Sequence, residues 1–248
     1  MTLLILSVLA MVIGVSMGLS GIGGFLVVPL MVTVAGAEAP QAVFTALTVN
    51  LLVTVSSGAL AMARRGIDRR YLAYMVTGSA LGAVLSAWLV KVLTGAAADL
   101  VIAAFLAAIG IVVIGSRSGP RRGASFPDPR VPGLALLGLG SLAQVSAALV
   151  GIGGPAITVP VLSAVGGSID RVVGTALLHG AFVSAVGLVV TRTAGAGFDP
   201  AAVVVIALVV VTATVVSLWR QRLSTVVPLR SVIGGLALLG AVIVLLRP

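Results

Sequence analysis

The sequence contains no cysteine, which excludes disulfide bonds, iron–sulfur clusters and thiolate zinc sites. Charge is also scarce, because only 8% of the 248 residues are Asp, Glu, Lys or Arg, and there is a single histidine. None of the charged residues lies inside a long apolar run. The residues that would form an acid–base pair, a metal cluster or a nucleophile with its base are therefore missing. We expect a protein that is not an enzyme and that carries no cofactor or metal.

Apolar residues make up 60% of the chain, and its mean hydropathy of +1.28 lies far above that of soluble domains. Apolar runs of roughly 18 or more residues recur along the whole length, which is typical of membrane-spanning helices. No charge precedes Glu38, so the first run lacks the basic start of a signal peptide. We expect this run to stay in the mature protein as a segment in the lipid bilayer.

The net charge of +9 comes almost entirely from arginine, which provides fourteen of the fifteen basic residues. Most of them fall in three connections between apolar runs, at residues 64–70, 117–130 and 220–230. Such clusters are typical of cytoplasmic loops, so we expect a multi-pass protein of the cell (inner) membrane. Nucleic acid is not an expected partner, because the sequence has no basic face with interleaved aromatic residues.

Glycine interrupts two of the apolar runs in the same way. Residues 18–29 read Gly-Leu-Ser-Gly-Ile-Gly-Gly-Phe-Leu-Val-Val-Pro, and residues 148–160 read Ala-Leu-Val-Gly-Ile-Gly-Gly-Pro-Ala-Ile-Thr-Val-Pro. Each copy offers a new helix start after its Gly-Ile-Gly-Gly, and we call these four residues the glycine tips (residues 21–24 and 151–154). Flexible backbone is costly in lipid, which indicates that both tips contact something other than lipid.

The two tips belong to an internal repeat. Their positions differ by an offset of 130 (151 − 21), and Thr45-Ala-Leu matches Thr175-Ala-Leu at the same offset. We therefore expect an N-terminal repeat at residues 1–115, a cytoplasmic linker rich in Gly, Ser, Pro and Arg at 116–132, and a C-terminal repeat at 133–248. Three further matches follow in order at an offset of 131: Gly66-Ile-Asp with Gly197-Phe-Asp, Ser86-Ala-Trp with Ser217-Leu-Trp, and Val101-Ile with Val232-Ile.

The arginine clusters limit how often the chain crosses the membrane. The second and third clusters both face the cytoplasm only if an even number of crossings separates them. Counting residues 134–165 as one span gives three crossings, whereas two arms that turn back at the tip give four. The same count puts the N-terminus outside, so the two halves start on opposite sides. We predict an all-α polytopic membrane protein of two inverted repeats, each with a glycine-tipped broken helical hairpin plus three spanning helices.

The return arms of these hairpins are short. Residues 25–35 reach only about half of the ~30 Å hydrocarbon core, which places the tips near mid-depth. A helix N-terminus carries free N–H groups and a partial positive charge, and it binds anions without a charged side chain. Two such starts facing each other would form an anion cradle. The alternative is that the glycines only permit close helix packing.

A few polar side chains lie in the apolar runs beside the tips. Polar groups in a membrane usually face the protein interior or a cavity, and interhelical hydrogen bonding is the alternative role for each of them. His179 is the only titratable group available to the protein for proton coupling. The predicted substrate-binding residues are Gly21, Gly23, Gly24, Thr45, Asn50, Gly151, Gly153, Gly154, Thr175 and His179.

Two other repeated features are assigned to structure rather than to the site. Asp68 and Asp199 each precede an apolar run, and we expect both as helix N-caps. Trp88 and Trp219 fall at the ends of runs, where aromatic residues anchor helices at the membrane interface.

With these motifs the sequence resembles the TauE/SafE family of anion exporters. The resemblance rests on both tips with the residues up to Pro29 and Pro160, on Gly174-Thr175, and on the two Gly-x-Asp motifs, and it covers essentially the whole chain. It implies transport of sulfur-containing anions such as sulfite, thiosulfate or sulfonates. The residues by themselves indicate only a transporter of small anions.

We therefore predict an exporter of small sulfur-containing anions that works by alternating access around the paired tips. A passive small-anion channel and a non-transporting membrane scaffold stay open as alternatives. The particular anion, the coupling ion, the direction of flux and the oligomeric state leave no signature in these motifs.

Overall fold

The computed structural model describes residues 2–20, 23–65, 67–93, 131–164 and 169–223, with scattered positions between 97 and 111 and residue 242. Within these ranges every regular element is helical, so the predicted all-α class is confirmed. The elements are α1 (Thr2–Ser20), η1 (Gly24–Leu26), α2 (Val27–Leu30), η2 (Met31–Ala35), α3 (Ala39–Arg65), α4 (Arg69–Val92), α6 (Gly133–Val150), α7 (Gly154–Ala164), α8 (Ile169–Thr193) and α9 (Ala202–Leu223).

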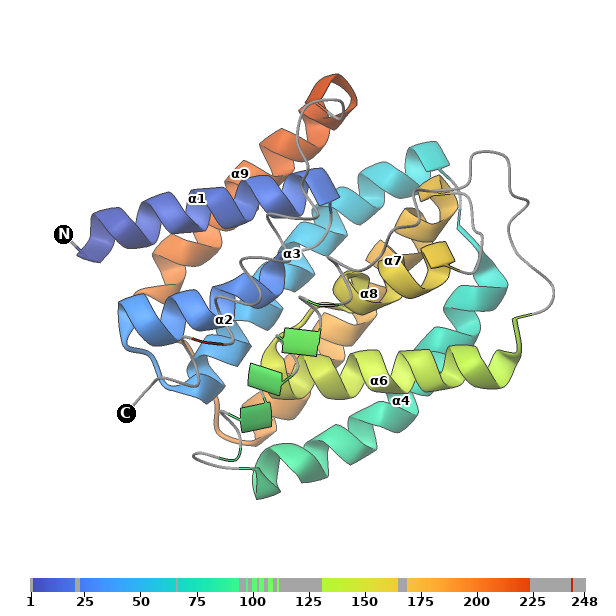
Figure 1. Cartoon of the computed structure of the whole chain (residues 1–248), viewed down its shortest axis with the longest axis horizontal. Coiled ribbons are helices and arrows are strands. Elements are labelled where there is room, and N and C mark those ends of the chain that lie inside the picture. The colour runs from blue at the N-terminus through green and yellow to red at the C-terminus, as the bar shows by residue number, and fades with distance from the viewer. Residues whose placement is uncertain are drawn as a thin grey trace.

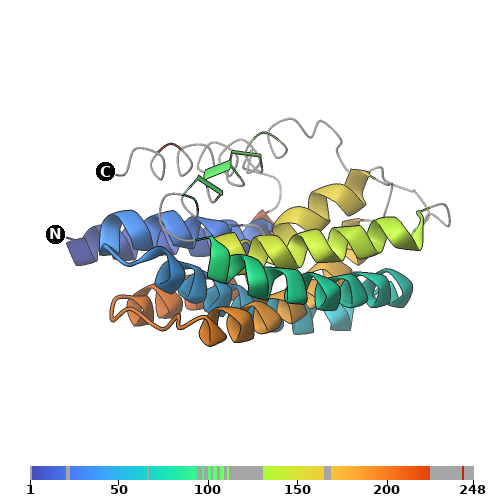
Figure 2. The same ribbon diagram turned by 90° about the horizontal axis from the view of Figure 1, so that it is seen from below.

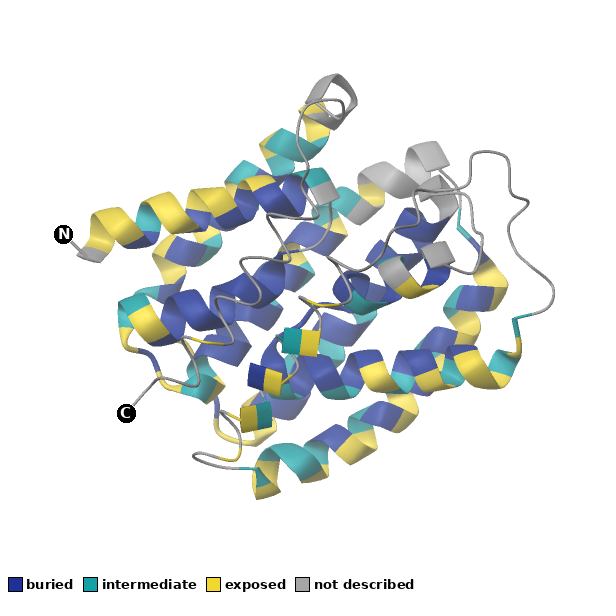
Figure 3. Ribbon diagram, viewed as in Figure 1, coloured by how far each residue is buried: buried dark blue, intermediate teal, exposed yellow. Residues whose placement is uncertain are grey.

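Five helices in the described part of the chain are long and apolar enough to cross a membrane. Large apolar side chains are exposed on their outer faces, such as Val84 at 75% and Leu134 at 80%, and Figure 3 shows exposed stretches along α1, α4 and α9. Lipid accepts such surfaces, whereas water does not. The chain is therefore a polytopic membrane protein. The five spans are Ala39–Ser57, Arg69–Val92, Gly133–Val150, Val172–Thr193 and Ala202–Trp219, and Leu3–Leu19 and Gly24–Ala35 are shorter apolar helices.

Helices α3 and α8 form the centre of the molecule, with the other helices around them (Figure 1). α3 packs along α8, α1 along α9 and α4 along α6, while α7 contacts α8. Seen from below, the helices run in a common direction (Figure 2), as spans of one bilayer do. Burial is greatest along α2, α3, α7 and α8 (Figure 3), so the two hairpins and the central pair share one core.

Several helix ends lie together at one end of the molecule (Figure 1). α3 ends, α4 begins, α6 begins and α7 ends on the right in Figure 1. Arg69 and Arg70 open α4 at this end, and the arginine-rich linker leads into α6. The α6–α7 pair thus enters and leaves at one end, as the crossing count requires. Residues 116–130 of the predicted linker lie outside the described residues, and the cytoplasmic side stays a prediction.

The chain doubles back at both glycine tips. α1 runs toward the centre, and η1, α2 and η2 return to the end from which α1 came; α6 and α7 do the same from the opposite end (Figure 1). Gly21 and Ile22 lie outside the described residues, whereas the second tip is described completely. The symmetry of two complete inverted halves stays a prediction, because most of the fifth predicted span of each half is not described.

Two helix pairs pack closely through repeat-related residues. A Cβ added to Gly14 of α1 would lie 2.7 Å from Thr212 Cβ of α9, and a Cβ added to Gly82 of α4 would lie 3.1 Å from Gln144 Cβ of α6. The offset of 130 relates Gly14 to Gln144 (144 − 14) and Gly82 to Thr212 (212 − 82). The offset seen in the sequence therefore also relates contacts in space.

Candidate functional site

The second glycine tip ends one helix and begins the next. Gly151 has φ 69°, a left-handed conformation that favours glycine, and its N–H donates to the Ala147 carbonyl at 2.9 Å, which closes α6. α7 begins at Gly154, with Pro155 in its first turn, where proline is tolerated. The glycines therefore allow a sharp reversal without side chains at the turn.

The start of α7 presents backbone N–H groups to its surroundings. The first N–H groups of a helix have no partner within the helix. Pro155 has no N–H, and the Ala156 N–H donates to the Gly153 carbonyl at 3.0 Å. The amides of Gly153 and Gly154 are thus the groups that this helix start, with its partial positive charge, can offer to an anion.

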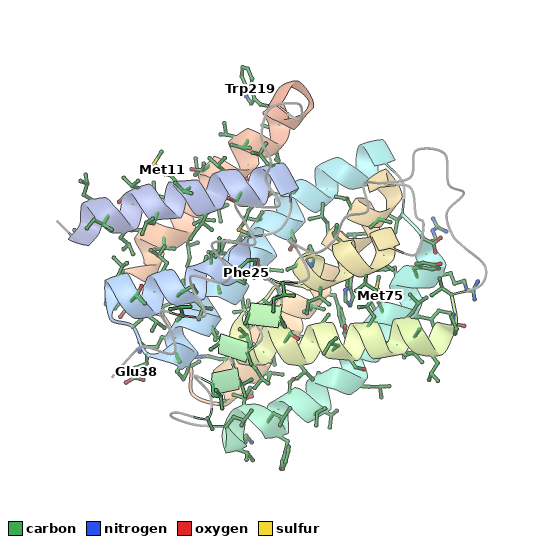
Figure 4. The ribbon with its side chains drawn as sticks, viewed as in Figure 1. Met11, Phe25, Glu38, Met75 and Trp219 are labelled. Atoms are coloured by element: carbon green, nitrogen blue, oxygen red, sulfur yellow. The ribbon has the colours of Figure 1, made fainter. Side chains whose placement is uncertain are left out.

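The first glycine tip has a less regular return. Gly23 has φ 149°, in the region that favours glycine, and its carbonyl accepts from the Leu26 N–H at 2.9 Å. A 3₁₀ turn, a short α-helix and a π-helix follow in succession up to Ala35. Phe25 is fully buried near the centre of the molecule, whereas Glu38 lies at the periphery beyond the return (Figure 4). The first tip therefore also lies deep in the protein.

Asn50 of α3 contacts both tips. Its Nδ2 donates to the Gly151 carbonyl at 2.9 Å. A Cβ added to Gly153 would lie 2.8 Å from Asn50 Cγ, and a Cβ added to Gly24 would collide with Asn50 Oδ1. The structure thus brings together Asn50, Gly24, Gly151 and Gly153. Asn50 is buried there, with 3% of its surface exposed.

His179 of α8 lies on the other side of the second tip. A Cβ added to Gly154 would lie 3.3 Å from His179 Nδ1 and 2.9 Å from the Cα of Gly180. The imidazole is fully buried, and its Nε2 lies 2.8 Å from the hydroxyl of Ser79 on α4. Its Nδ1 has no hydrogen-bond partner among the described residues. A buried nitrogen without a partner is unusual, and this one points at the start of α7.

The two threonines of the predicted site have other partners. Thr45 donates to the Gln41 carbonyl one turn earlier in α3, at 2.8 Å. Thr175 accepts from the Asp68 N–H at 3.0 Å, which ties α8 to the start of α4. The described geometry does not bring either hydroxyl to the tips, and their role in binding stays a prediction.

Sequence reasoning missed two neighbours of the site, Gly180 and Ser79. A Cβ added to Gly180 would collide with the Pro155 ring, so glycine is needed there for α7 to approach α8. Gly180 is the counterpart of Asn50 at the repeat offset of 130 (180 − 50), and the repeat could have identified it. Ser79 lies in an apolar run and carried no signal that distinguished it from other small residues.

Together, the apolar spans and the buried tips define an all-helical, multi-pass membrane protein with a small polar centre and no charged side chain among the residues named in it. The family model described as sulfite exporter TauE/SafE matches residues 5–246. The chain therefore belongs to the TauE/SafE sulfite exporter family, which places it among membrane exporters of sulfite and related sulfur-containing anions. No curated protein matches the chain.

Proposed function

We propose that this chain exports small sulfur-containing anions, such as sulfite or sulfonates, by alternating access around the paired glycine tips. The observation that carries the proposal is the position of Asn50, which contacts the first tip at Gly24 and bonds the second at Gly151. Two broken hairpins that reach the centre from opposite ends and meet at one amide side chain provide a single site that can open to either side.

Neutral groups hold the anion at this site. The amide N–H groups of Gly153 and Gly154 and the Nδ2 of Asn50 donate hydrogen bonds to its oxygens. In a region of low dielectric such dipoles bind a charge strongly, yet the site stays free of buried charge when it is empty. In the described state Asn50 Nδ2 bonds the Gly151 carbonyl, and an anion oxygen replaces that carbonyl as its acceptor.

The contacts between the tips suit a reversible opening. Asn50 joins them through one hydrogen bond, which is worth about 1 kcal/mol net, and the facing residues are glycines. The larger contacts, α1 with α9 and α4 with α6, each pair one helix from either half of the repeat. We infer that the two predicted inverted halves rock against each other at these contacts and at the α3–α8 contact while the tips separate.

Leucine at a tip tests the proposal. Gly153→Leu fills the space that Asn50 occupies, because even a Cβ at Gly153 would lie 2.8 Å from Asn50 Cγ. Gly138→Leu is the matched control, since a Cβ added to this exposed glycine of α6 has no atom within 4 Å. Sulfite efflux from proteoliposomes should be lost in the first variant and unchanged in the second, with both proteins inserted in equal amounts.

Wild-type flux of sulfite should saturate, and sulfite on the far side should accelerate it by counterflow. A passive channel would show neither effect, and a scaffold would show no flux. If Gly153→Leu inserts normally and transports sulfite at the wild-type rate, the tips are not the site and the proposal fails.

A further inference from the structure

We propose that His179 accepts a hydrogen bond from the transported ligand, and that the site therefore selects sulfur oxyanions that carry an O–H or N–H over those that offer only acceptor oxygens. Protonated sulfite and aminosulfonates belong to the selected class. The proposal rests on the function proposed above and specifies its substrate.

The hydrogen bonds of Ser79 define which nitrogen of His179 carries the hydrogen. The Ser79 hydroxyl lies 3.0 Å from the Gly140 carbonyl and 2.8 Å from His179 Nε2. A serine has one hydrogen to donate, and a carbonyl can only accept it. The hydroxyl therefore donates to Gly140 and accepts from an Nε2–H.

A neutral imidazole with its hydrogen on Nε2 carries a lone pair on Nδ1. The neutral form is the one expected here, because the ring is fully buried and Ser79, which bonds it, is uncharged. Nδ1 is the atom 3.3 Å from the Cβ position of Gly154 and lacks a partner among the described residues. The start of α7 is thus faced by an acceptor that nothing in the described structure uses.

The second tip consequently offers donors and an acceptor in one place. The amides of Gly153 and Gly154 donate, and His179 Nδ1 accepts. A fully deprotonated, acceptor-only anion would set an oxygen lone pair against the Nδ1 lone pair. A ligand with one O–H or N–H satisfies all three groups. Because a buried acceptor left without a donor weakens binding, the preference should be about tenfold or more.

Sulfamate and methanesulfonate provide a direct probe. Both are monoanions of the same shape, but the amino group of sulfamate donates hydrogen bonds and the methyl group of methanesulfonate does not. We expect sulfamate to inhibit sulfite flux at about one-tenth of the concentration that methanesulfonate requires. A tenfold difference in affinity corresponds to the cost of leaving one buried acceptor without a donor. The thermal shift of the purified protein with each probe gives the same ranking without a transport assay.

Three variants separate the role of His179 from its packing. His179→Gln keeps a group that can reach Ser79 but removes the nitrogen at the tip, so the two probes should become equal. His179→Asn keeps an acceptor near the position of Nδ1 and should retain the preference. Ser79→Ala removes one partner of the ring but leaves its bond to the Met75 backbone, which still holds the hydrogen on Nε2, so this variant should retain the preference. Ser86→Ala on the same helix is the control, because Ser86 donates to the nearby Ala83 carbonyl and not to His179.

The outcomes distinguish this inference from the function on which it rests. Equal effects of sulfamate and methanesulfonate on the wild type would overturn the role of His179 while leaving sulfite export intact. A preference that survives His179→Gln would also overturn it. Absence of sulfite flux in the wild type would instead overturn the proposed function. If His179→Gln does not fold, the comparison of sulfamate with methanesulfonate on the wild type and on His179→Asn still decides.

Discussion

The two glycine tips are repeat-related but differ in what faces them. Gly24 meets the side chain of Asn50, and Gly154 meets the backbone of Gly180; the tips and their partners both keep the offset of 130 (154 − 24 and 180 − 50). Asn50 contacts both tips, whereas its counterpart Gly180 has no side chain and so admits Pro155 beside Gly154, close to Nδ1 of His179. Both halves therefore have the backbone break, whereas the side chains around it differ.

The helical segments that follow the two tips also differ. The first consists of a 3₁₀ turn, a short α-helix and a π-helix, and the second is the regular helix α7 of 11 residues. A regular helix aligns its peptide dipoles and presents a stronger partial charge at its start. We infer that the helix start at the second tip contributes more to binding the anion than the irregular return at the first tip, with Asn50 donating from between them.

Alanine at the two repeat-related glycines should have the largest effects. Gly24→Ala collides with Asn50 Oδ1, and Gly154→Ala meets the Gly180 Cα at 2.9 Å. Each change overpacks the core and should cost about 3 kcal/mol, measured as a lower melting temperature in detergent. Adding Asn50→Gly removes the collision in Gly24→Ala but also the donor to the Gly151 carbonyl, so the double variant should be less destabilised than the sum of the two single changes. Asn50→Gly should not help Gly154→Ala, whose obstacle is backbone; recovery there would contradict the contacts described.

Removing the amide of Asn50 should have the next largest effect. Asn50→Leu leaves the buried Gly151 carbonyl without its 2.9 Å donor, which costs about 1–3 kcal/mol, and it removes one anion donor, so sulfite flux should fall more than tenfold. Thr45→Val is the comparison, because the Thr45 hydroxyl donates to the Gln41 carbonyl in its own helix. Flux in Thr45→Val should stay within about twofold of wild type. A larger loss would give Thr45 the role in binding that the sequence predicts.

The reversal of the chain could be predicted from the sequence because it leaves two independent signals there. Glycine has no side chain, so both tips stand out in apolar runs, and the arginine clusters count the crossings. That Asn50 lies beside the tips could also be predicted from the sequence, since a buried amide in an apolar run needs a partner. The contact of Ser79 with His179 could not be predicted, because a serine on α4 meets His179 through the packing of α4 on α8.

The two predicted N-caps differ in burial and should differ in energy. Asp68 is 9% exposed and accepts from the Tyr71 N–H at 2.9 Å, whereas Asp199 is less buried and accepts from the Ala201 N–H at 2.8 Å. Asp68→Ala should cost about 1–2 kcal/mol and Asp199→Ala about 0.5–1 kcal/mol, both measured by chemical denaturation. Asp68→Asn keeps a capping oxygen and should stay close to wild type. Equal costs for the two alanine variants would show that burial does not strengthen the first cap.

The smallest predicted effect concerns the helix pairs α4–α6 and α1–α9, and here the substitution should raise the stability rather than lower it. Gln144 of α6 is fully buried, and neither polar atom of its side chain has a partner among the described residues, whereas its counterpart Gly14 of α1 has no side chain to satisfy. Gln144→Met keeps the length of the side chain without the amide, and relief of one unmet polar group should raise stability by about 1 kcal/mol. For a chain of this size that is a rise of about 2–4 °C in melting temperature, with sulfite flux unchanged. A lower melting temperature would mean that a bound water or ion pairs with the amide, and would make the α4–α6 interface a polar site in its own right.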